Sequence, residues 1–580
     1  MNGGDRLAEV LERRGVRTLF TLCGGHIAPL LVGAKRLGIR VVDVRHEADA
    51  VFAADATARL TGAPGVAAVT AGPGVTNAIT ALKNAQMAPS PLVLIGGATA
   101  TLLKGRGALQ DIDQHALVRP HVKWLGSPRS VRELAPALER AFHEAAAGLP
   151  GPVFLEVPVD LLYDESLVRQ WYLAGTGGGG LAGWGLRRYL ERHLKKLFAR
   201  DAGPPPAPLP PAPLQPPQRA VSGAARLLAG AERPVLVVGG QAVLRAAEVG
   251  EVAAAVAALG LPVYLAGGAR GLLGAESPLQ LRHRRKEALR EADLVILAGM
   301  PADFRLDYGR HIARGARLVG ANVSRGDLTR NRKPDVAAHA DPGLFLRALA
   351  AAAGGRRASG KAAARGEWLA RLRARDEERE REIAEQARQP AGGYLNPLAL
   401  CRAIDRQLGP ESLIVADGGD FVATAAYTLR PRAPLSWLDP GAFGTLGVGG
   451  GFALGAKLAR PGAEVWLLWG DGSAAFSLAE FDALARHGVG VVAVVGNDAG
   501  WTQIAREQVP VLGDDVGTVL ARTAYHTVAE GYGGRGFLLE RAEEMDGVLT
   551  EARRLARSGV PVLINAQIGK TEFRKGSISI

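Results

Sequence analysis

The sequence predicts an α/β protein built from three doubly wound parallel sheets. Short apolar runs alternate with helical stretches over residues 5–163, and the same alternation resumes from residue 392 to the end. Three more apolar runs lie between these segments. Such alternation is typical of parallel sheets that are covered by helices on both faces. A chain of 580 residues is also too long for one core, and at roughly 150 residues per domain it would hold about three to four domains. The boundaries in the sequence support three.

The first domain is expected at residues 1–163. Its buried strands are predicted at Arg17–Leu22, Ile39–Val44, Val66–Thr70 and Leu92–Ile95. Ligands of parallel sheets bind beyond the carboxyl ends of the strands. Glu47 follows the second of these strands, and the turn Gly72-Pro73-Gly74-Val75-Thr76-Asn77 follows the third. We therefore expect the site residues of this domain at that edge of its sheet.

Residues 164–218 interrupt the pattern and are expected to be a linker. They contain a glycine run at 177–180, a helical stretch at Gly185–Phe198 and a proline-rich run at 204–217. The apolar positions of the helical stretch fall on one side, namely Leu186, Tyr189, Leu190, Leu194 and Leu197. The remaining positions are mostly basic, namely Arg187, Arg188, Arg192, Lys195 and Lys196. This pattern fits a helix on a membrane surface, but packing on the neighbouring domain is the favoured interpretation.

The middle domain is expected at residues 219–350, and the last domain at residues 392–580. Strands of the middle domain are predicted at Pro234–Val238, Pro262–Tyr264 and Leu294–Leu297. Its glycine pairs at 239–240 and 267–268 do not form a dinucleotide fingerprint. Residues 351–391 are expected to be a linker whose charged segment, 355–388, forms an exposed helix.

Four arginines of the middle domain, Arg270, Arg282, Arg284 and Arg285, would suit phosphate groups, although a solvated basic surface is the favoured interpretation. The whole chain is basic, with a net charge of +13 and a pI near 9.9. Its 70 lysines and arginines are spread among 57 acidic residues, and no nucleic-acid-binding motif accompanies them. Compositional drift is therefore the favoured explanation, and binding of an anionic substrate is the alternative.

The two cysteines, Cys23 and Cys401, lie in different predicted domains, so the sequence indicates neither a disulfide framework nor a zinc site. No window of eighteen uninterrupted apolar residues and no signal-peptide pattern occurs. A hydrophobic content of 47% with 22% charged residues is ordinary for a globular protein. These features predict a globular chain without a membrane span.

Two loops of the last domain carry the chemistry of a magnesium site. Gly470-Asp471-Gly472 and Asn497-Asp498-Ala499-Gly500 each follow an apolar run. Asp471 and Asp498 are 27 positions apart, which is one strand–helix–strand unit, so both loops emerge at the same edge of neighbouring or near-neighbouring strands. Magnesium prefers oxygen ligands, which here would be two carboxylates, the Gly500 carbonyl, water and phosphate oxygens. The glycines let the backbone approach the phosphates.

These motifs resemble those of the thiamine diphosphate enzymes, and the resemblance covers nearly the whole chain. The stretch Trp437–Val448 is most similar to the acetolactate-synthase-like family of animals, the 2-hydroxyacyl-CoA lyases of the endoplasmic reticulum. Gly24-Gly25-His26-Ile27 and Arg45-His46-Glu47 also resemble the benzaldehyde lyases. The resemblance implies that residues 1–163 form the pyrimidine-binding domain and residues 392–580 the diphosphate-binding domain. Residues 219–350 would be the middle domain between them.

The resemblance also implies the roles of individual residues. Glu47 would share a proton with the aminopyrimidine ring, His26 would accept the substrate's hydroxyl proton, and Gln110 would bond to the alkoxide. Other cofactor contacts would be Gly25, Pro73, Asn77, Gly418, Gly419, Asp420, Gly444, Leu446, Gly472 and Ser473. Metal ligands would be Asp471, Asp498 and Gly500. Family members usually carry Asn-Asn in the second loop, so Asp498 is a departure from the pattern, and Asn497 is a less favoured alternative ligand.

The implied activity is cleavage of 2-hydroxyacyl-CoA to formyl-CoA and an aldehyde one carbon shorter, as in fatty acid alpha-oxidation. Implied cofactors are thiamine diphosphate and Mg²⁺, with FAD weakly supported. A homodimer or homotetramer would form active sites between subunits. The animal family has an N-terminal anchor that this sequence lacks, so either the chain is truncated or this form is soluble. The resemblance implies a location at the endoplasmic reticulum membrane, with only peripheral contact unless an anchor is missing from this chain, and a cytoplasmic location is the alternative. The alternatives are an FAD-containing acetolactate synthase and a non-catalytic scaffold, and retention of Glu47, Asp471 and Asp498 argues against the scaffold.

Overall fold

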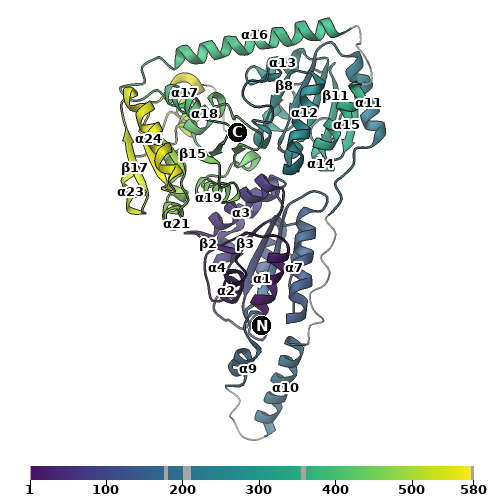
Figure 1. The fold of residues 1–580 in the computed structure, drawn as a ribbon, viewed down its shortest axis with the longest axis vertical. Coiled ribbons are helices and arrows are strands. Elements are labelled where there is room, and N and C mark those ends of the chain that lie inside the picture. Colours follow the sequence, from purple (N-terminus) through teal and green to yellow (C-terminus); the bar gives the residue numbers. More distant parts are fainter. Residues whose placement is uncertain (1, 175–180, 200–210, 355–360, 576–580) are drawn as a thin grey trace. The chain divides into compact units, whose positions relative to one another are not determined.

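A computed structural model describes residues 2–174, 181–199, 211–354 and 361–575. It contains three six-stranded sheets in which every strand pair is parallel, and helices flank each sheet (Figure 1). The predicted α/β class with three parallel sheets is therefore confirmed. The chain forms two compact units: Met1–Ala58 with Ala63–Pro211, and Arg59–Gly62 with Ala212–Ile580. The first unit holds one sheet and the second holds two.

The sheet of the first unit has the strand order β2-β1-β3-β4-β6-β5. Its strands are β1 (Thr18–Thr21), β2 (Arg40–Asp43), β3 (Gly65–Val69), β4 (Leu92–Ala98), β5 (Trp124–Gly126) and β6 (Pro152–Pro158). Its main helices are α1 (Gly3–Arg13), α2 (Ala28–Arg36), α3 (Glu47–Thr61), α4 (Pro73–Asn77), α5 (Ile79–Met87) and α7 (Val131–Ala146). Because β1 pairs with both β2 and β3, the loops that follow these three strands share one edge of the sheet.

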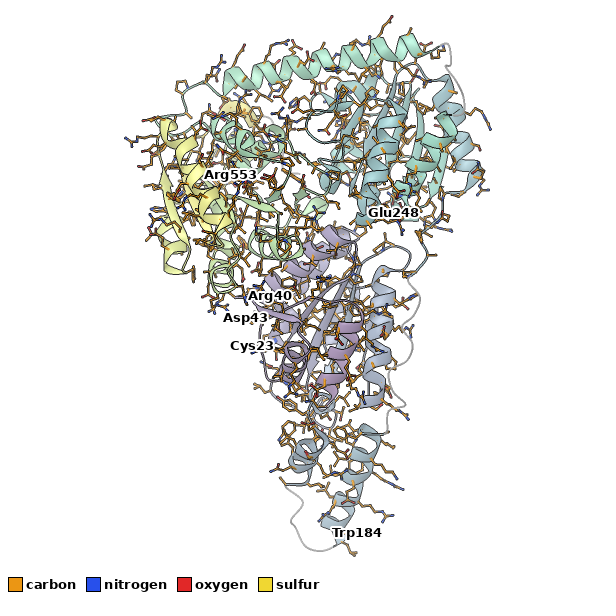
Figure 2. All side chains as sticks on the ribbon, viewed as in Figure 1. Cys23, Arg40, Asp43, Trp184, Glu248 and Arg553 are labelled. Atoms are coloured by element: carbon orange, nitrogen blue, oxygen red, sulfur yellow. The ribbon has the colours of Figure 1, made fainter. Side chains whose placement is uncertain are left out.

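Helix α10 (Leu181–Leu197) packs with only part of its apolar stripe. Leu190, Leu194 and Leu197 are buried, and His193 bonds to the Thr101 hydroxyl over 2.9 Å. By contrast, 49% of Leu186 and 57% of Tyr189 are exposed, as is most of Trp184, which lies near one end of the helix in Figure 2. The expectation that the stripe packs on the domain is thus right for its second half and wrong for its first. The predicted glycine run at 177–180 and residues 204–210 of the proline-rich run lie outside the described residues.

The middle sheet has the strand order β12-β11-β10-β7-β8-β9. Its strands are β7 (Pro234–Val238), β8 (Val263–Leu265), β9 (Gln280–Leu281), β10 (Leu294–Ala298), β11 (Arg317–Asn322) and β12 (Val336–His339). Its main helices are α11 (Gln218–Gly230), α12 (Val249–Leu259), α13 (Arg285–Glu291) and α15 (Pro342–Gly354). All five residues of β7 and of β10 are buried, which agrees with their uninterrupted apolar sequences.

Helix α16 (Ala362–Gln386) corresponds to the charged segment that was expected to be exposed. That expectation is wrong for one face of the helix, because Trp368, Leu372 and Ile383 are buried. Trp368 and Leu372 join the core of the middle domain, and the Trp368 indole donates to the Pro234 carbonyl over 3.1 Å. Sparse apolar positions among many charges are sufficient to dock a helix when each of them reaches the core.

The last sheet has the strand order β14-β13-β15-β16-β18-β17. Its strands are β13 (Ser412–Ala416), β14 (Trp437–Leu438), β15 (Glu464–Gly470), β16 (Val492–Asn497), β17 (Arg535–Leu539) and β18 (Val562–Gln567). Its main helices are α17 (Pro397–Gln407), α18 (Asp420–Thr428), α19 (Gly449–Ala459), α20 (Asp471–Ser477), α21 (Glu480–Arg486), α22 (Thr502–Leu512), α23 (Tyr525–Gly531) and α24 (Met545–Arg557). β15 and β16 are direct neighbours, with Gly470 opposite Gly496.

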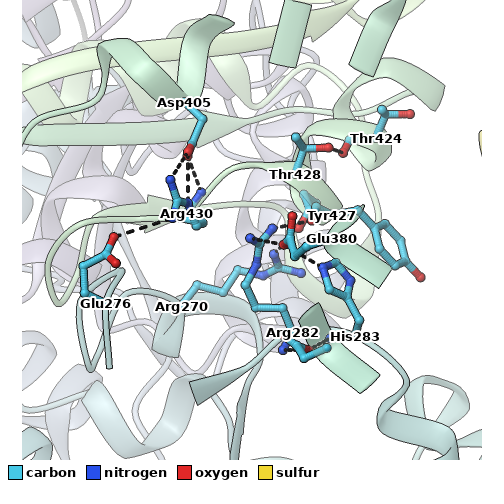
Figure 3. Close-up of polar contacts among 12 residues, drawn as sticks. Arg270, Glu276, Arg282, His283, Glu380, Asp405, Thr424, Tyr427, Thr428 and Arg430 are labelled. Carbon is cyan, nitrogen blue, oxygen red and sulfur yellow. Dashed lines mark hydrogen bonds and ion pairs between the residues drawn. The ribbon is translucent and has the colours of Figure 1, made fainter. Parts of the chain in front are cut away.

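The arginines of the middle domain make defined contacts within the second unit. Arg282 donates to Glu380 over 2.8 Å and also to the Tyr427 carbonyl, and Figure 3 shows Arg270 and Arg282 reaching toward Tyr427 beside Glu380. Only 17% of the Arg282 side chain is exposed, so a merely solvated basic surface, the interpretation favoured from sequence, is wrong for this residue. Arg270 and Arg285 donate to backbone carbonyls over 2.6 and 2.8 Å and have no carboxylate partner within 4 Å among the described residues.

Both cysteines are free thiols, and Cys23 is exposed while Cys401 is buried. The distance between them in the sequence had indicated no disulfide framework. Within the described ranges, no helix is long and apolar enough to cross a membrane.

Candidate active site

The two predicted metal loops lie side by side in the structure. Asp471 directly follows β15, and Asp498 directly follows β16. The Asp471 carboxylate accepts backbone N–H bonds from Gly472 over 2.9 Å and from Gly500 over 3.0 Å, and the second bond ties the loops together. The Tyr525 hydroxyl donates to the Asp471 carbonyl over 2.9 Å. Adjacent parallel strands therefore place the two carboxylates at one edge of the sheet, as their spacing predicts.

The charges of Asp471 and Asp498 are not neutralised by an ion pair within 4 Å in the part of the chain that the structure describes. Both side chains are buried, and burial together with the charge of Asp471 raises the pKa of Asp498 to about 6. Two buried carboxylates of this kind fit a divalent cation. No cluster of three His, Cys, Asp or Glu side chains is found among the described residues. The remaining ligands would therefore be the Gly500 carbonyl, water and phosphate oxygens, which is the usual arrangement for Mg²⁺.

Asn497, the alternative metal ligand, is already engaged in the interior. Its amide nitrogen donates to the Thr523 carbonyl and to the Asn565 amide oxygen, both over 3.2 Å, and its Oδ1, the atom that would bind a metal, accepts the Ala499 N–H over 3.3 Å. Asp498 instead lines a small cavity of about 30 Å³ together with Asp471 and Gly500. The geometry thus supports Asp498 as the ligand from the second loop.

Three glycines near this cavity allow close packing or a left-handed backbone that a side chain would not. A Cβ atom on Gly472 would lie 2.5 Å from the Trp501 ring, and one on Gly418 would lie 2.2 Å from the Leu446 side chain. Gly419 has a φ of +107°, which side chains rarely tolerate. The Ser473 hydroxyl lies 3.0 Å from the Gly418 carbonyl, so it connects this loop to α20. These residues fit the diphosphate contacts that the sequence predicts.

Asp417 organises the glycine-rich loop at residues 444–449, a role that sequence reasoning missed. Its carboxylate accepts N–H bonds from Gly447 over 2.9 Å, from Gly449 over 2.7 Å and from the Trp469 indole over 3.1 Å. Burial raises the pKa of Asp417 to about 7. The loop begins at Gly444, whose φ is +65°. In the sequence, Asp417 follows a predicted strand and precedes Gly418 and Gly419, and this position was the available signal for its role.

Asp420, a predicted cofactor contact, forms a two-pronged ion pair with Arg506, with both N–O distances at 2.9 Å. Arg506 is a further charged residue at this site that the sequence analysis did not identify. Lys570 is another, since its ammonium lies 3.3 Å from where a Cβ atom on Gly500 would stand. Both cations lie near the loops that would hold phosphate groups.

In the first unit, Glu47 is the first residue of α3 and only 6% of it is exposed. The Asn77 amide at the end of α4 donates to Glu47 Oε2 over 2.9 Å. The strand order thus brings together two predicted site residues that lie 30 positions apart. Pro73 begins α4 after Gly72, whose φ is +60°. Asn77 therefore orients one carboxylate oxygen of Glu47, Oε2.

His26 lies in the turn after β1, and its Nδ1 is 3.2 Å from the Thr70 hydroxyl. Burial lowers the pKa of His26 below its usual value of 6.5, so the ring is neutral at pH 7. His26 and Thr70 can lie this close to their neighbours because those neighbours are glycines. A Cβ atom on Gly24 would lie 2.4 Å from Thr70, and one on Gly97 would lie 2.6 Å from His26 Cβ. The Tyr163 hydroxyl donates a hydrogen bond to the Gly25 carbonyl over 3.1 Å.

Gln110 packs against the turn that opens α4, and its backbone has a φ of +62°. A Cβ atom on Gly72 would lie 2.9 Å from Gln110. The buried residue that anchors this turn is Gln114, which accepts the Gly72 N–H over 3.0 Å and donates to the Gly97 carbonyl over 3.1 Å. The sequence analysis missed Gln114. Within the part of the chain that the structure describes, Gln110 makes no hydrogen bond to His26 or Glu47, so its role stays a prediction.

Comparison with known proteins matches three stretches of the chain to the domains of one family. Residues 1–117 match the thiamine pyrophosphate enzyme N-terminal TPP binding domain, residues 221–349 its central domain and residues 417–566 its C-terminal TPP binding domain. The chain is 50% identical over 590 residues to the 2-hydroxyacyl-CoA lyase 2 of Danio rerio, covering 100% of this chain and 93% of that protein. The protein of the same name from Homo sapiens is 49% identical over 586 residues, with 100% and 92% covered. A probable acetolactate synthase of Mycobacterium bovis is 34% identical over 573 residues, with 97% and 95% covered.

Proposed function

Because this chain belongs to the thiamine pyrophosphate enzyme family and is a lyase dependent on that cofactor, we propose that it cleaves 2-hydroxyacyl-CoA. The bond between the thioester carbonyl carbon and the hydroxyl-bearing carbon breaks, which yields an aldehyde one carbon shorter and formyl-CoA. The observation that carries this proposal is the 50% identity over 100% of the chain to a 2-hydroxyacyl-CoA lyase. The buried carboxylates of Glu47, Asp471 and Asp498 lend it further support.

Thiamine diphosphate, when bound, supplies a nucleophilic carbon and stabilises the negative charge that bond cleavage releases. Glu47 exchanges a proton at Oε1 while Asn77 holds its other oxygen. His26, with Nδ1 bonded to Thr70, presents Nε2 as the atom that accepts the substrate's hydroxyl proton. Asp471, Asp498 and the Gly500 carbonyl would hold Mg²⁺ against the diphosphate.

The proposal is tested by incubating the chain with a 2-hydroxyacyl-CoA, thiamine diphosphate and Mg²⁺. We expect equal amounts of the shortened aldehyde and of formyl-CoA or its hydrolysis product, formate. Turnover should require the cofactor.

The second candidate, an FAD-containing acetolactate synthase, is favoured by the 34% identity to the Mycobacterium bovis protein. Acetolactate from pyruvate without aldehyde from 2-hydroxyacyl-CoA would replace the lyase proposal with this one.

His26→Ala is predicted to lower cleavage of 2-hydroxyacyl-CoA by about 10²-fold or more, the usual range for loss of an acid–base group. Hydrogen–deuterium exchange at the thiazolium carbon should stay nearly unchanged, because that step depends on Glu47. In the wild type, kcat/KM should fall as the pH drops through the lowered pKa of His26, since the protonated ring cannot accept a proton. Equal losses in cleavage and exchange would show that His26 supports the cofactor instead.

We also propose that the active sites form between two subunits, one contributing the Glu47 half and the other the Asp471 half. Glu47→Gln and Asp471→Ala, each inactive alone, should then complement each other when dissociated, mixed and reassembled. Random pairing gives one intact site in every mixed dimer, so about a quarter of wild-type activity should return. Unmixed controls should remain inactive. No recovery in verified mixed dimers would place both halves of each site in one subunit.

The endoplasmic reticulum location implied by the resemblance, with peripheral membrane contact, is likewise a proposal. Its support is the exposed end of α10, where Leu181, Trp184 and Leu186 accompany Arg187 and Arg188. Apolar and basic side chains on one exposed segment suit an anionic lipid surface. Failure of the chain to sediment with anionic vesicles would contradict membrane contact.

A further inference from the structure

Gln114 is a buried residue whose side-chain amide makes three hydrogen bonds to separate segments of the first unit. It is the first residue of α6 (Gln114–Val118), and only 2% of it is exposed. Its oxygen accepts the Gly72 N–H over 3.0 Å, and its nitrogen donates to the Gly97 carbonyl over 3.1 Å and to Glu156 Oε1 over 3.0 Å. Both N–H groups and the oxygen of the amide are thus engaged, so the side chain is held in one position.

The two backbone groups that this amide holds lie beside the two residues proposed to move protons. Gly72 precedes α4, and Asn77 at the end of α4 donates to Glu47 over 2.9 Å. Gly97 lies in β4 against His26, since a Cβ atom on Gly97 would stand 2.6 Å from His26 Cβ. A shift of the amide would therefore move the neighbours of both residues.

Glu156 of β6 fixes which way the Gln114 amide faces. Its side chain is 1% exposed, and it accepts hydrogen bonds from the Lys104 ammonium over 2.6 Å and from the Ser127 hydroxyl over 3.2 Å. Burial favours the neutral acid, but the hydrogen bonds from Lys104 and Gln114 outweigh it and hold the pKa of Glu156 below its usual value of 4.5. At neutral pH Glu156 is therefore a carboxylate that can only accept. The NH₂ group of Gln114 must point toward it, and the Gln114 oxygen toward Gly72.

Lys104 connects these residues to the loop that carries Gln110. Both lie in residues 99–113, between β4 and α6. The Lys104 side chain is 49% exposed, so its ammonium meets solvent on one side and Glu156 on the other. His115 Nε2 lies 3.4 Å from the same carboxylate. Because a buried carboxylate needs compensating charge, the loop with Gln110 is held to the same network as the two turns.

We propose that Gln114, anchored by Glu156, is a positioning residue that sets the spacing between Glu47 and His26. The inference rests on the proposed function for the roles of those two residues. The amide acts through the Gly72 turn and strand β4. A displacement of about 1 Å at a reacting group can cost about 10²-fold in rate. Loss of this bridge is therefore expected to slow both the exchange step that depends on Glu47 and the cleavage step that depends on His26.

The test replaces Gln114 with residues that fit the space but not the hydrogen bonds. Gln114→Glu keeps the size of the side chain, but it sets a second carboxylate against Glu156 and removes the donor to Gly97. Gln114→Asn keeps a neutral amide that is too short for all three bonds, and it serves where Gln114→Glu does not fold. In the folded, cofactor-loaded proteins, kcat for cleavage of 2-hydroxyacyl-CoA should fall about 10- to 100-fold, with KM changed less than about threefold. Hydrogen–deuterium exchange at the thiazolium carbon should slow as well.

Asn84→Asp is the matched control, because Asn84 belongs to a second buried amide–carboxylate pair of the same unit. It is fully buried in α5 and donates to Asp55 over 3.0 Å, so the substitution also sets two carboxylates against each other. It should lower the Tm as Gln114→Glu does, while kcat and exchange in the folded protein stay at the wild-type level. The double variant Gln114→Glu/Glu156→Gln restores a donor and an acceptor between the two side chains and should recover part of both rates.

Wild-type kcat and exchange in a folded Gln114→Glu or Gln114→Asn protein would overturn the proposal. Losses of the same size in folded Asn84→Asp would also overturn it, because the effect would then follow from lost stability alone. No recovery in the folded double variant would remove Glu156 as the anchor. Failure of the lyase proposal is distinguishable, since it appears as absent cleavage in the wild type. Thiazolium exchange needs only the cofactor and would still respond to Gln114.

Discussion

Glu47→Gln is expected to abolish turnover, lowering it by at least about 10²–10⁴-fold, while thiamine diphosphate still binds. Glutamine keeps the size of the side chain and its contact with the Asn77 amide but cannot accept and return a proton at Oε1. Hydrogen–deuterium exchange at the thiazolium carbon should slow in parallel with turnover. Cofactor affinity, measured by calorimetry, should change little, because the diphosphate contacts lie on the other unit.

Asp55→Asn provides a matched control on the same helix. Asp55 is fully buried and accepts a bond from the Asn84 amide over 3.0 Å, the same pairing that Glu47 makes with Asn77. Its substitution should reduce stability and leave the chemistry of the folded protein unchanged. If Glu47→Gln retained near-normal activity, or if Asp55→Asn were equally inactive when folded, Glu47 would not be the proton-transfer residue.

Asp471→Ala is expected to abolish the magnesium dependence of thiamine diphosphate binding and to weaken that binding by more than about 100-fold. The substitution removes one of two carboxylates at the site and also the oxygens that hold Gly472 and Gly500. Titration of the cofactor at several Mg²⁺ concentrations measures both effects. Unchanged magnesium dependence in a folded Asp471→Ala protein would contradict the metal site.

Asp498→Asn separates the charge of the second ligand from its geometry. An amide oxygen can occupy the same position, so affinity should remain within about tenfold of the wild type. Asn497→Ala is the comparison: it should destabilise the fold by removing the bonds to Thr523 and Asn565, without loss of magnesium dependence. Loss of binding in Asp498→Asn with none in Asn497→Ala would show that the charge of Asp498 is essential.

Local patterns were sufficient to predict much of the fold and part of the site. Apolar runs of strand length predicted β7 at its observed bounds and β1 to β4 within a few residues. The spacing of Asp471 and Asp498 predicted that their loops meet, because consecutive parallel strands end at the same edge. The α10 and α16 predictions failed in part, since a helical pattern shows which positions are apolar but not which of them reach a core.

The sequence by itself determined the class of the protein, the order of its strands and helices, and the residue types at the strand ends. Only the tertiary structure decided how side chains far apart in the chain are partnered. In the folded chain the Asn497 amide donates to Asn565, and Asp417 accepts hydrogen bonds from the Gly447–Gly449 turn. Arg270 and Arg285 have no carboxylate partner among the described residues. Periodicity and turn chemistry act over a few neighbouring residues, whereas hydrogen-bond partners and burial depend on which segments pack together.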